Sequence, residues 1–311
     1  MQLSILLAEQ IAAMVLMILA GFAAARARLL PEGSGKAVSA VVMFILAPCM
    51  VFSAFQMEFS MEKLVGLLIG LAAGIAVHVL YIPFSVLMAR MLGMDNLDRA
   101  SMIYSNSGNL IVPLLGAVLG SEYVFYSCGY LAVQTTLIWV HCIRLASGEA
   151  EINLKKILLN PNIIAMELGL IFFLLPLHLP GVLQNTVDRI GSTIGPMSMI
   201  GIGIIMSSMN IAAVFKDKKT WGLTVLRLII FPLVFVILLA FSHVASLFPL
   251  AGKVLVATVL AAAGPTAVSI SQQAEVYGGD SVRAGKVNVM TTLFCVITMP
   301  VIIYIYQIIC L

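Results

Sequence analysis

Long apolar runs, separated by short polar or charged segments, follow one another along almost the whole chain of 311 residues. Each run holds roughly 20 residues, the length that an α-helix needs to cross the hydrocarbon layer of a bilayer. The pattern therefore predicts an all-α integral membrane protein with ten transmembrane helices. The expected spans lie near residues 4–25, 37–55, 63–89, 100–119, 123–146, 161–179, 187–211, 220–245, 251–274 and 283–306.

Polar residues, glycine and proline interrupt two of these apolar runs. Ser105–Asn109 stands ahead of Pro113 in the fourth run, and Ala263–Thr266 stands in the ninth. An unwound backbone inside a bilayer leaves N–H and C=O groups without partners, which costs several kcal/mol per group unless protein or a watery cavity receives them. Paired breaks at matching places in two halves of a chain indicate the binding site of a secondary transporter.

Lysine and arginine are distributed very unevenly between the loops on the two sides of the expected spans. Cytoplasmic loops gather these residues, so the richer side is expected to be cytoplasmic and both termini outside. A missed or invented span would reverse every later loop, so the uneven division supports ten spans. The poorer side receives Lys63, Arg189 and Lys253; the richer side receives Arg26, Arg28, Lys36, Arg90, Arg99, Arg144, Lys155, Lys156, Lys216, Lys218, Lys219, Arg283 and Lys286.

Ten spans divide into five and five, and an odd number in each half makes the halves insert with opposite orientation. We expect residues 1–146 to form one five-helix repeat, 147–160 a cytoplasmic linker, and 161–311 a second, inverted five-helix repeat. Pro48 in the second span corresponds to Pro196 in the seventh. The linker is too short for a separate regulatory domain.

Composition excludes several classes of protein. With 61% hydrophobic and 10% charged residues and a mean hydropathy of +1.10, the chain lies far from soluble proteins, in which about 25% of residues are charged. The net charge of +3 is dispersed, so nucleic acid is not an expected partner. The five cysteines show no CxxC spacing, so neither a disulfide framework nor a metal site is expected. Metalloprotease, prenyl-transfer and acyl-transfer motifs are absent from the sequence, so an enzyme is not expected.

The broken segments have a chemistry of their own. Half-helices that begin at a break present unpaired N–H groups and the positive end of a helix dipole of roughly half a charge, which suits a carboxylate. The alternative is that glycine and proline only kink packed helices. The predicted substrate-binding residues are Asn106, Gly108, Asn109, Pro113, Gly264, Pro265, Thr266, Ser269, Gln272 and Gln273.

Ionisable residues inside spans are expensive and mark functional positions. Glu167 and Arg227 lie at equal depth from the cytoplasmic side, which predicts an ion pair between the sixth and eighth spans; the alternative leaves Arg227 at the interface and Glu167 in a watery vestibule. His78 falls in the middle of the third span, where it either relays protons or serves packing. Two readings also stay open for a further set of polar residues, cavity lining or hydrogen bonding between helices: Gln134, Asn288 and Thr291.

Several motifs resemble those of the auxin efflux carrier family, within a superfamily that also contains the bile acid sodium symporters. Pro265–Ser269 followed by Ala274–Asp280 is similar to the ninth-helix signature of that family. Asn106–Asn109 with Pro113 resembles its fourth-helix crossover motif. Pro48 and the stretch from Pro196 to Gly203 are similar to elements of the second and seventh helices, so the resemblance covers the whole chain.

The resemblance implies a ten-helix inverted-repeat fold in which helices 4 and 9 are broken and cross, and transport of small organic anions by an elevator-like movement. The chain departs from the family in two ways. It lacks the long cytosolic loop of many plant carriers, which favours a bacterial-type member. Ile111 stands where the pattern has a glycine two residues before the proline.

The expected function is transport of mono- or dicarboxylates, such as malate, malonate or auxin-like acids, by alternating access across a bacterial cytoplasmic membrane. The alternatives are a sodium-coupled organic anion symporter of the bile acid type and an anion channel or sensor. No cofactor is expected apart from a coupling ion, H⁺ or Na⁺. The expected partners are the substrate and the lipid bilayer, with a homodimer as an alternative to internal packing for the stripe of Gly66, Gly70 and Gly74.

Overall fold

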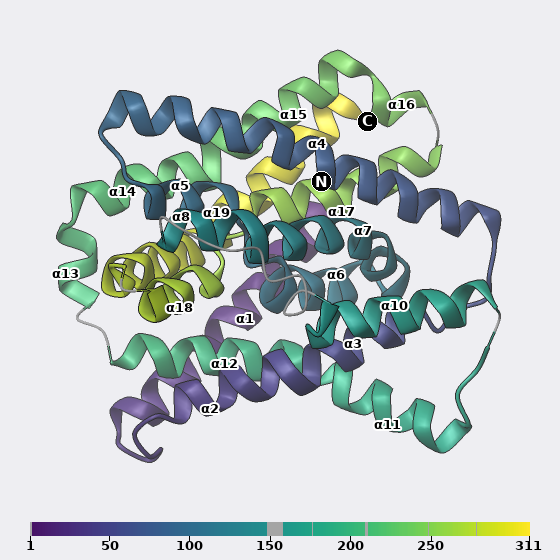
Figure 1. Ribbon diagram of the computed structural model, residues 1–311, viewed down its shortest axis with the longest axis horizontal. Helices are drawn as coiled ribbons and strands as arrows, with labels where there is room; N and C mark the ends of the chain where they lie inside the picture. The colour runs from purple at the N-terminus through teal and green to yellow at the C-terminus, as the bar shows by residue number, and fades with distance from the viewer. Residues whose placement is uncertain (1, 148–157, 176, 209–210, 248, 278) are drawn as a thin grey trace.

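The computed structural model describes residues 2–147, 158–175, 177–208, 211–247, 249–277 and 279–311 (Figure 1). In these ranges the chain is helical apart from short connections and one single-residue β-bridge. The helices coincide with the predicted apolar runs, whereas ten membrane crossings and an inverted repeat stay predictions. Among the described residues, five helices are long and apolar enough to cross a membrane: Ser34–Ala54, Met61–Leu92, Gly181–Ser207, Lys218–Ser242 and Ser281–Cys310.

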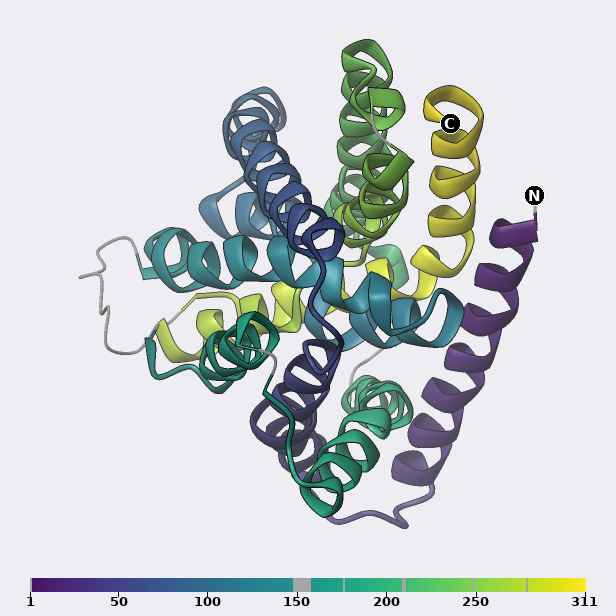
Figure 2. The same ribbon diagram turned by 90° about the vertical axis from the view of Figure 1, so that its right-hand side faces the viewer.

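One group of helices comes from the beginnings of the two halves of the chain. In it α1 packs along α12, and α3 packs against α10 and α11 (Figures 1 and 2). Close approach of α1 and α12 requires glycine at two places, because a Cβ on Gly21 or Gly203 would collide with the main chain of the opposite helix. The group comprises α1 (Gln2–Arg26), α2 (Ser34–Val41), η1 (Val42–Leu46), α3 (Ala47–Ala54), α10 (Pro161–Leu174), α11 (Gly181–Ser192) and α12 (Ile194–Ser207).

The second group contains the longest helices and both breaks. Its members in the first half are α4 (Met61–Leu92), α5 (Asn96–Ile103), η2 (Ser107–Ile111), α6 (Val112–Val118), α7 (Ser121–Leu137), η3 (Ile138–Cys142) and α8 (Ile143–Ser147). Its members in the second half are α13 (Ile211–Lys216), α14 (Lys218–Val225), η4 (Leu226–Ile230), α15 (Phe231–Ser242), α16 (Val244–Leu247), α17 (Pro249–Ala263), α18 (Val268–Tyr277) and α19 (Ser281–Cys310). α4 packs on α7 and α17, and α19 packs on α14, α17 and α18.

The stripe of Gly66, Gly70 and Gly74 lies in the interface between α4 and α7. A Cβ at the first two positions would meet Tyr126, and at the third it would meet Tyr130. The stripe therefore packs inside the chain and offers no surface to a second copy. A homodimer formed through another surface remains an untested prediction.

Three of the π-helical turns precede a proline by the same interval. η1, η2 and η4 end two residues before Pro48, Pro113 and Pro232 respectively. Proline has no N–H and its ring clashes with the carbonyl four residues earlier, so the preceding turn widens to accommodate it. The prolines in these helices thus explain local widening, and they do not by themselves explain the two breaks.

Candidate functional site

The two predicted breaks lie side by side and are joined through their main chains. Ser105 and Thr266 form an antiparallel bridge. The N–H of Asn106 donates to the carbonyl oxygen of Pro265 at 2.7 Å, and the N–H of Ala267 donates to the carbonyl oxygen of Tyr104 at 3.0 Å. Helices α5 and α17 therefore end, and η2 and α18 begin, at one shared crossing point. The two predicted breaks therefore meet; that they interrupt the fourth and ninth of ten spans stays a prediction.

Gln134 on α7 holds the first break. Its Nε2 donates to the carbonyl oxygen of Ser105 at 3.0 Å and to Oγ of Ser107 at 2.6 Å. Its Oε1 accepts from the N–H of Ser105 at 3.2 Å, from Oγ of Ser105 at 2.8 Å and from the Tyr130 hydroxyl at 3.0 Å. One side-chain amide thus satisfies both main-chain groups of the central residue. This is the hydrogen-bonding reading that the sequence left open for Gln134.

Two side chains of α19 hold the second break. Nδ2 of Asn288 donates to the carbonyl oxygen of Thr266 at 2.5 Å, and the N–H of Thr266 donates to Oγ1 of Thr291 at 3.1 Å. The hydroxyl of Thr266 donates to the carbonyl oxygen of Ser101 in α5 at 3.0 Å. The second break therefore also supports α5, the helix that leads into the first break. The central residues of both breaks therefore have no bare amide to offer a ligand. The donors that remain for a ligand lie in the residues that follow each break.

Those donors are the first-turn N–H groups of the helices that leave the crossing. η2 continues into α6 as one helix over Ser107–Val118, and α18 spans Val268–Tyr277. The N–H groups of an opening turn have no acceptor within their own helix, and they carry the positive end of its dipole. Two helix N-termini of opposite halves therefore meet at the same place.

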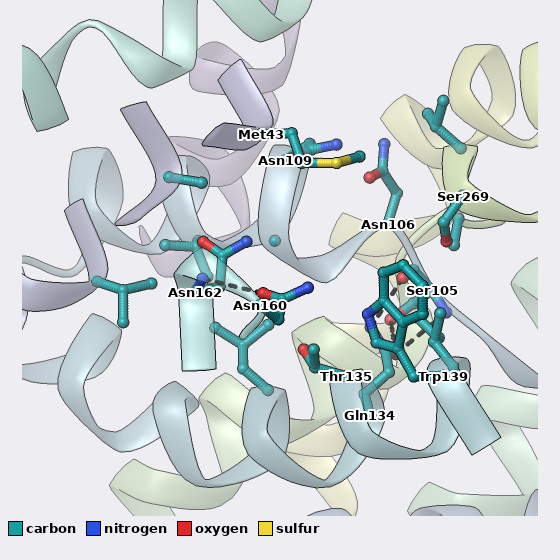
Figure 3. Close-up of a pocket in the computed structure, with 18 of the residues that line it drawn as sticks. Met43, Ser105, Asn106, Asn109, Gln134, Thr135, Trp139, Asn160, Asn162 and Ser269 are labelled. Carbon is teal, nitrogen blue, oxygen red and sulfur yellow. Dashed lines mark hydrogen bonds between the residues drawn. The ribbon is translucent and has the colours of Figure 1, made fainter. Parts of the chain in front are cut away.

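A cavity of about 420 Å³ opens beside these N-termini (Figure 3). Among the residues that line it, Asn106, Gly108 and Asn109 come from the first break and Val268, Ser269 and Gln273 from the second, as predicted for all but Val268. In the described part of the structure, its lining residues include no Asp, Glu, Lys, Arg or His. Apolar side chains and an indole complete the wall: Met43, Ala47, Val51, Val112, Leu131, Ile138, Trp139, Ile143, Met166, Ile194 and Ala267.

The other predicted site residues lie near the crossing but do not line this cavity. Pro113 lines a second cavity of about 490 Å³ beside α6, together with Asp188. Gly264 faces Ile111, whose side chain would lie 3.0 Å from an added Cβ. Pro265 and Thr266 serve the crossing itself through the bonds described above. The side chain of Gln272 lies outside the described part of the structure.

Two buried amides at the cavity carry polar atoms without a hydrogen-bond partner in the described structure. Nδ2 of Asn106 has none, although the side chain is only 4% exposed. Gln273 donates from Nε2 to the carbonyl oxygen of Ile138 at 3.3 Å, while its Oε1 has no partner. A buried polar group without a partner costs about 1–3 kcal/mol, so these atoms are poised to bond a ligand or water.

The predicted ion pair between Glu167 and Arg227 is wrong. Arg227 is fully buried, and its Nη1 donates to the carbonyl oxygens of Met102 at 3.1 Å and Ile103 at 3.5 Å, the last residues of α5. Glu167 is exposed on α10. Equal depth in two helices says nothing about the direction in which each side chain points around its helix. Arg227 instead caps the negative end of the half-helix that leads into the first break.

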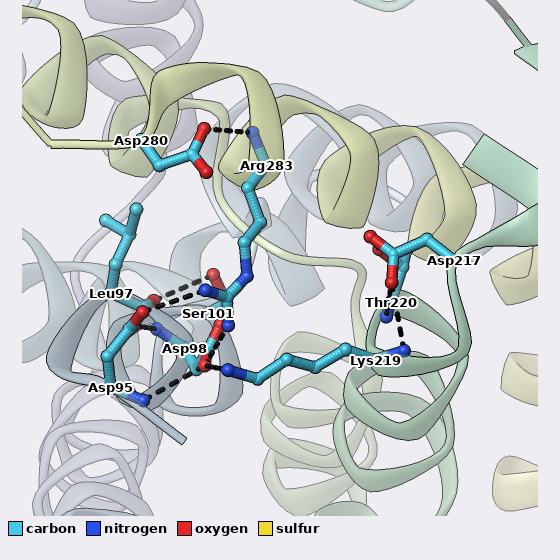
Figure 4. A network of polar contacts seen from close by, with 9 residues as sticks. All are labelled: Asp95, Leu97, Asp98, Ser101, Asp217, Lys219, Thr220, Asp280 and Arg283. Carbon is cyan, nitrogen blue, oxygen red and sulfur yellow. Dashed lines mark hydrogen bonds and ion pairs between the residues drawn. The ribbon is translucent and has the colours of Figure 1, made fainter. Parts of the chain in front are cut away.

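A polar cluster at the beginning of α5 escaped sequence reasoning (Figure 4). Asp98, only 2% exposed, accepts from Nη2 of Arg283 and lies 3.1 Å from Nζ of Lys219. Asp95 caps α5 and lies 2.8 Å from Nη1 of Arg283. The cluster ties α5 to α14 and to α19, the helix that holds the second break. The capping pattern at Asp95 and Asp98 was visible in the sequence, but the distant partners were not.

The cluster sets the protonation of Asp95. Burial raises the pKa of this carboxyl, but hydrogen bonds from the main-chain N–H groups of Asp98 and Leu97 and the charges of Arg283 and Lys219 outweigh it. The pKa of Asp95 therefore lies below its ordinary value of 3.8. The carboxylate stays charged at neutral pH and keeps its bonds to α5 and α19.

Other cavity residues were missed because nothing local distinguished them. Trp139 of η3 and the pair Asn160 and Asn162 at the beginning of α10 line the cavity. Oδ1 of Asn160 accepts from the N–H of Asn162 at 2.9 Å and caps α10, with Pro161 as its first residue. An Asn–Pro step before an apolar run predicts a helix start, but not that this start faces the crossing.

Comparison with known families identifies the class of protein. A sequence profile described as membrane transport protein matches residues 6–154 and again residues 149–303, one match in each half. The chain therefore belongs to the membrane transport protein family, the family of the auxin efflux carriers, as its motifs predicted. It is a membrane transporter with apolar helices. No curated protein sequence matches the chain.

Proposed function

We propose that this transporter carries small organic anions, bound at the crossing of the two broken helices and moved by alternating access. The observation that supports this most directly is the convergence of two helix N-termini and the unpartnered Nδ2 of Asn106 on one cavity. A carboxylate placed there exchanges its hydration for main-chain and amide donors. No Lys, Arg or His is among the described residues that line the cavity, so none of them would trap the bound anion in a strong ion pair.

The cavity wall narrows the class of substrate. Most of the lining is apolar, and Trp139 adds a flat aromatic face. The crossing offers donors, and no charged side chain among the described lining residues would pair with a second carboxylate. These features favour a monocarboxylate with an apolar body over dicarboxylates such as malate and malonate.

The alternative of a sodium-coupled symporter is less favoured. Sodium sites need several oxygen ligands close together, commonly with a carboxylate among them. Among the side chains that the structure describes, those lining the crossing cavity include no Asp or Glu. Proton coupling or uncoupled transport is the better proposal, and uptake with and without a sodium gradient distinguishes them.

The experiment begins with a thermal-shift screen of the purified protein against benzoate, hexanoate, lactate, malate and malonate. A ligand that binds the native state raises its apparent stability by mass action, about 2.7 kcal/mol at a hundred times the Kd. We expect benzoate or hexanoate to raise the melting temperature more than malate or malonate. Saturable exchange in proteoliposomes then indicates a carrier, whereas single-channel currents would indicate a pore.

Asn106→Ala and Asn109→Ala test the site itself. We expect each variant to lose exchange by at least tenfold with little change in melting temperature, because Nδ2 of Asn106 bonds no other described group. Asn185→Ala, at an exposed position of α11, is the matched control. Exchange at the wild-type rate in Asn106→Ala would remove the amide from the proposed site.

A further inference from the structure

His78 and Arg227, one in each half of the chain, have the same spacing to a proline. His78 lies five residues before Pro83 in α4, and Arg227 lies five residues before Pro232 at the beginning of α15. Both side chains are buried, at 1% and 0% exposure. Arginine keeps its charge at every physiological pH, whereas histidine gains and loses one. The first half thus has a titratable base, and the second half a permanent cation, five residues before a proline.

The hydrogen bonding of His78 leaves one ring nitrogen open. Nδ1 lies 2.7 Å from the carbonyl oxygen of Gly74. A carbonyl oxygen only accepts, so Nδ1 carries the hydrogen and Nε2 of the neutral ring holds a lone pair. Nε2 is buried and has no partner in the described structure. This nitrogen is an unused site for a proton.

Four groups on other elements face the His78 ring, and none is a carboxylate. The ring of Tyr130 in α7 lies 5.4 Å from that of His78, and the ring of Tyr104 lies 6.0 Å away. Burial disfavours a charged imidazole, and so do the like charges of Arg227 of η4 and His141 of η3. The tyrosine faces favour it through cation–π attraction. On its own helix, Tyr81 lies one turn away, with Cζ of Arg227 6.0 Å from its ring.

Tyr130 connects His78 to the substrate cavity. Its hydroxyl donates to Oε1 of Gln134 at 3.0 Å and lies 3.3 Å from Oγ of Ser105. Gln134 and Ser105 both line the cavity. The side chain of Tyr130 thus lies between His78 and two residues of the cavity wall. A negative charge in the cavity favours the protonated ring, and by thermodynamic reciprocity the protonated ring favours the anion.

We infer that Nε2 of His78 binds the proton that accompanies the organic anion, with Arg227 as the permanently charged counterpart in the other half. The inference rests on the proposed function. The proton comes from the solution, binds Nε2 without breaking any bond of the cargo, and leaves on the opposite side. Imidazolium and carboxylate cross together as a neutral pair.

The test measures protons taken up when benzoate binds the full-length protein in nanodiscs. Calorimetry in phosphate and in Tris separates the heat of buffer ionisation and gives the number of protons per bound anion. His78→Asn keeps a donor in the place of Nδ1 and removes the second nitrogen. We expect proton uptake in the wild type, none in His78→Asn, and a benzoate affinity reduced at least tenfold at pH 6. His178→Gln, at an exposed position, is the control and should behave as the wild type.

Two results would overturn the inference: wild-type proton uptake in His78→Asn, or benzoate binding without proton uptake by the wild type anywhere between pH 5 and 8. If none of the five acids binds or raises the melting temperature, the proposed function fails separately. Nuclear magnetic resonance of labelled histidine then decides about the proton site. A His78 ring that stays neutral down to pH 4.5 overturns it, and protonation at Nε2 upholds it.

Discussion

The two breaks meet the same physical requirement with different side chains. At the first break, Gln134 alone serves the N–H and the carbonyl of Ser105. At the second, Asn288 takes the carbonyl of Thr266 and Thr291 takes its N–H. Both arrangements satisfy main-chain groups that would otherwise be orphaned in a region without water. At the first break one side chain bonds both main-chain groups, whereas at the second break two side chains bond one group each.

The difference has a consequence for the site. Gln134 also lines the substrate cavity, so the support of the first break and the binding surface share one side chain. Asn288 and Thr291 do not line that cavity. The first break is therefore expected to be the more sensitive one, in stability and in transport together, and the second to be sensitive mainly in stability.

Gln134→Leu should have the largest effect. The substitution keeps a side chain of similar size but orphans two main-chain groups of Ser105, at roughly 2–6 kcal/mol of unfolding free energy. We expect that loss in mixed-micelle unfolding titrations, together with loss of exchange. Thr136→Ala on the same helix is the control, because Thr136 is exposed and its hydroxyl donates only to the carbonyl oxygen of Ala132, at 2.8 Å. A stable and active Gln134→Leu variant would contradict the expectation that the first break is the more sensitive of the two.

Thr291→Val and Asn288→Leu should each cost less, about 1–3 kcal/mol, because each orphans one main-chain group. The double variant should approach the loss of Gln134→Leu. All three are measured by the same unfolding titration, with benzoate affinity as the second readout. If a single change at the second break lowers the unfolding free energy as much as Gln134→Leu does, Asn288 and Thr291 do not share the support of that break.

A smaller effect is expected from acid, through the cluster that joins α5 to α19. Asp95 has a pKa below 3.8, so its bonds contribute stability above that pH, and this stability is lost as the pH falls through the lowered value. The melting temperature of the wild type should fall more steeply below pH 4 than that of Asp95→Asn, whose side chain still caps the helix. Parallel curves for the two proteins would show that the cluster contributes nothing there.

Glu167→Gln should have the smallest effect, within about 0.5 kcal/mol, since exposed positions without special contacts tolerate substitution. Arg227→Gln should affect the end of α5, and the double variant should add nothing beyond it. Unfolding titrations of the three variants measure this. A coupling energy between Glu167 and Arg227 would support the ion pair between them that the structure does not contain.

Sequence reasoning predicted the parts of the molecule that local chemistry determines. The polar interruption around Asn106 and the glycine and proline around Pro265 marked both breaks, because such residues disrupt helices wherever they stand. Depth within a span was also readable. Lys219 and Arg283 were predicted on the same side, and both lie at Asp98.

The remaining contacts depend on direction, which one sequence does not contain. Sequence reasoning placed Arg227 inside an apolar run, but its rotation around the helix axis decides between Glu167 and the carbonyls of α5. The partners of Ser105 and Thr266 come from α7 and α19, and only the packed fold identifies them. The polar residues of those helices were noted, yet their pattern fitted a cavity lining equally well.

The bridge between Ser105 and Thr266 joins the halves through main-chain atoms that every amino acid except proline possesses. Replacement of a neighbouring side chain leaves that join chemically intact. Relatives that take different cargoes could therefore exchange the residues facing the cavity without dismantling the architecture that surrounds it. In such a fold the main-chain bridge persists, while the side chains that face the cavity are free to evolve.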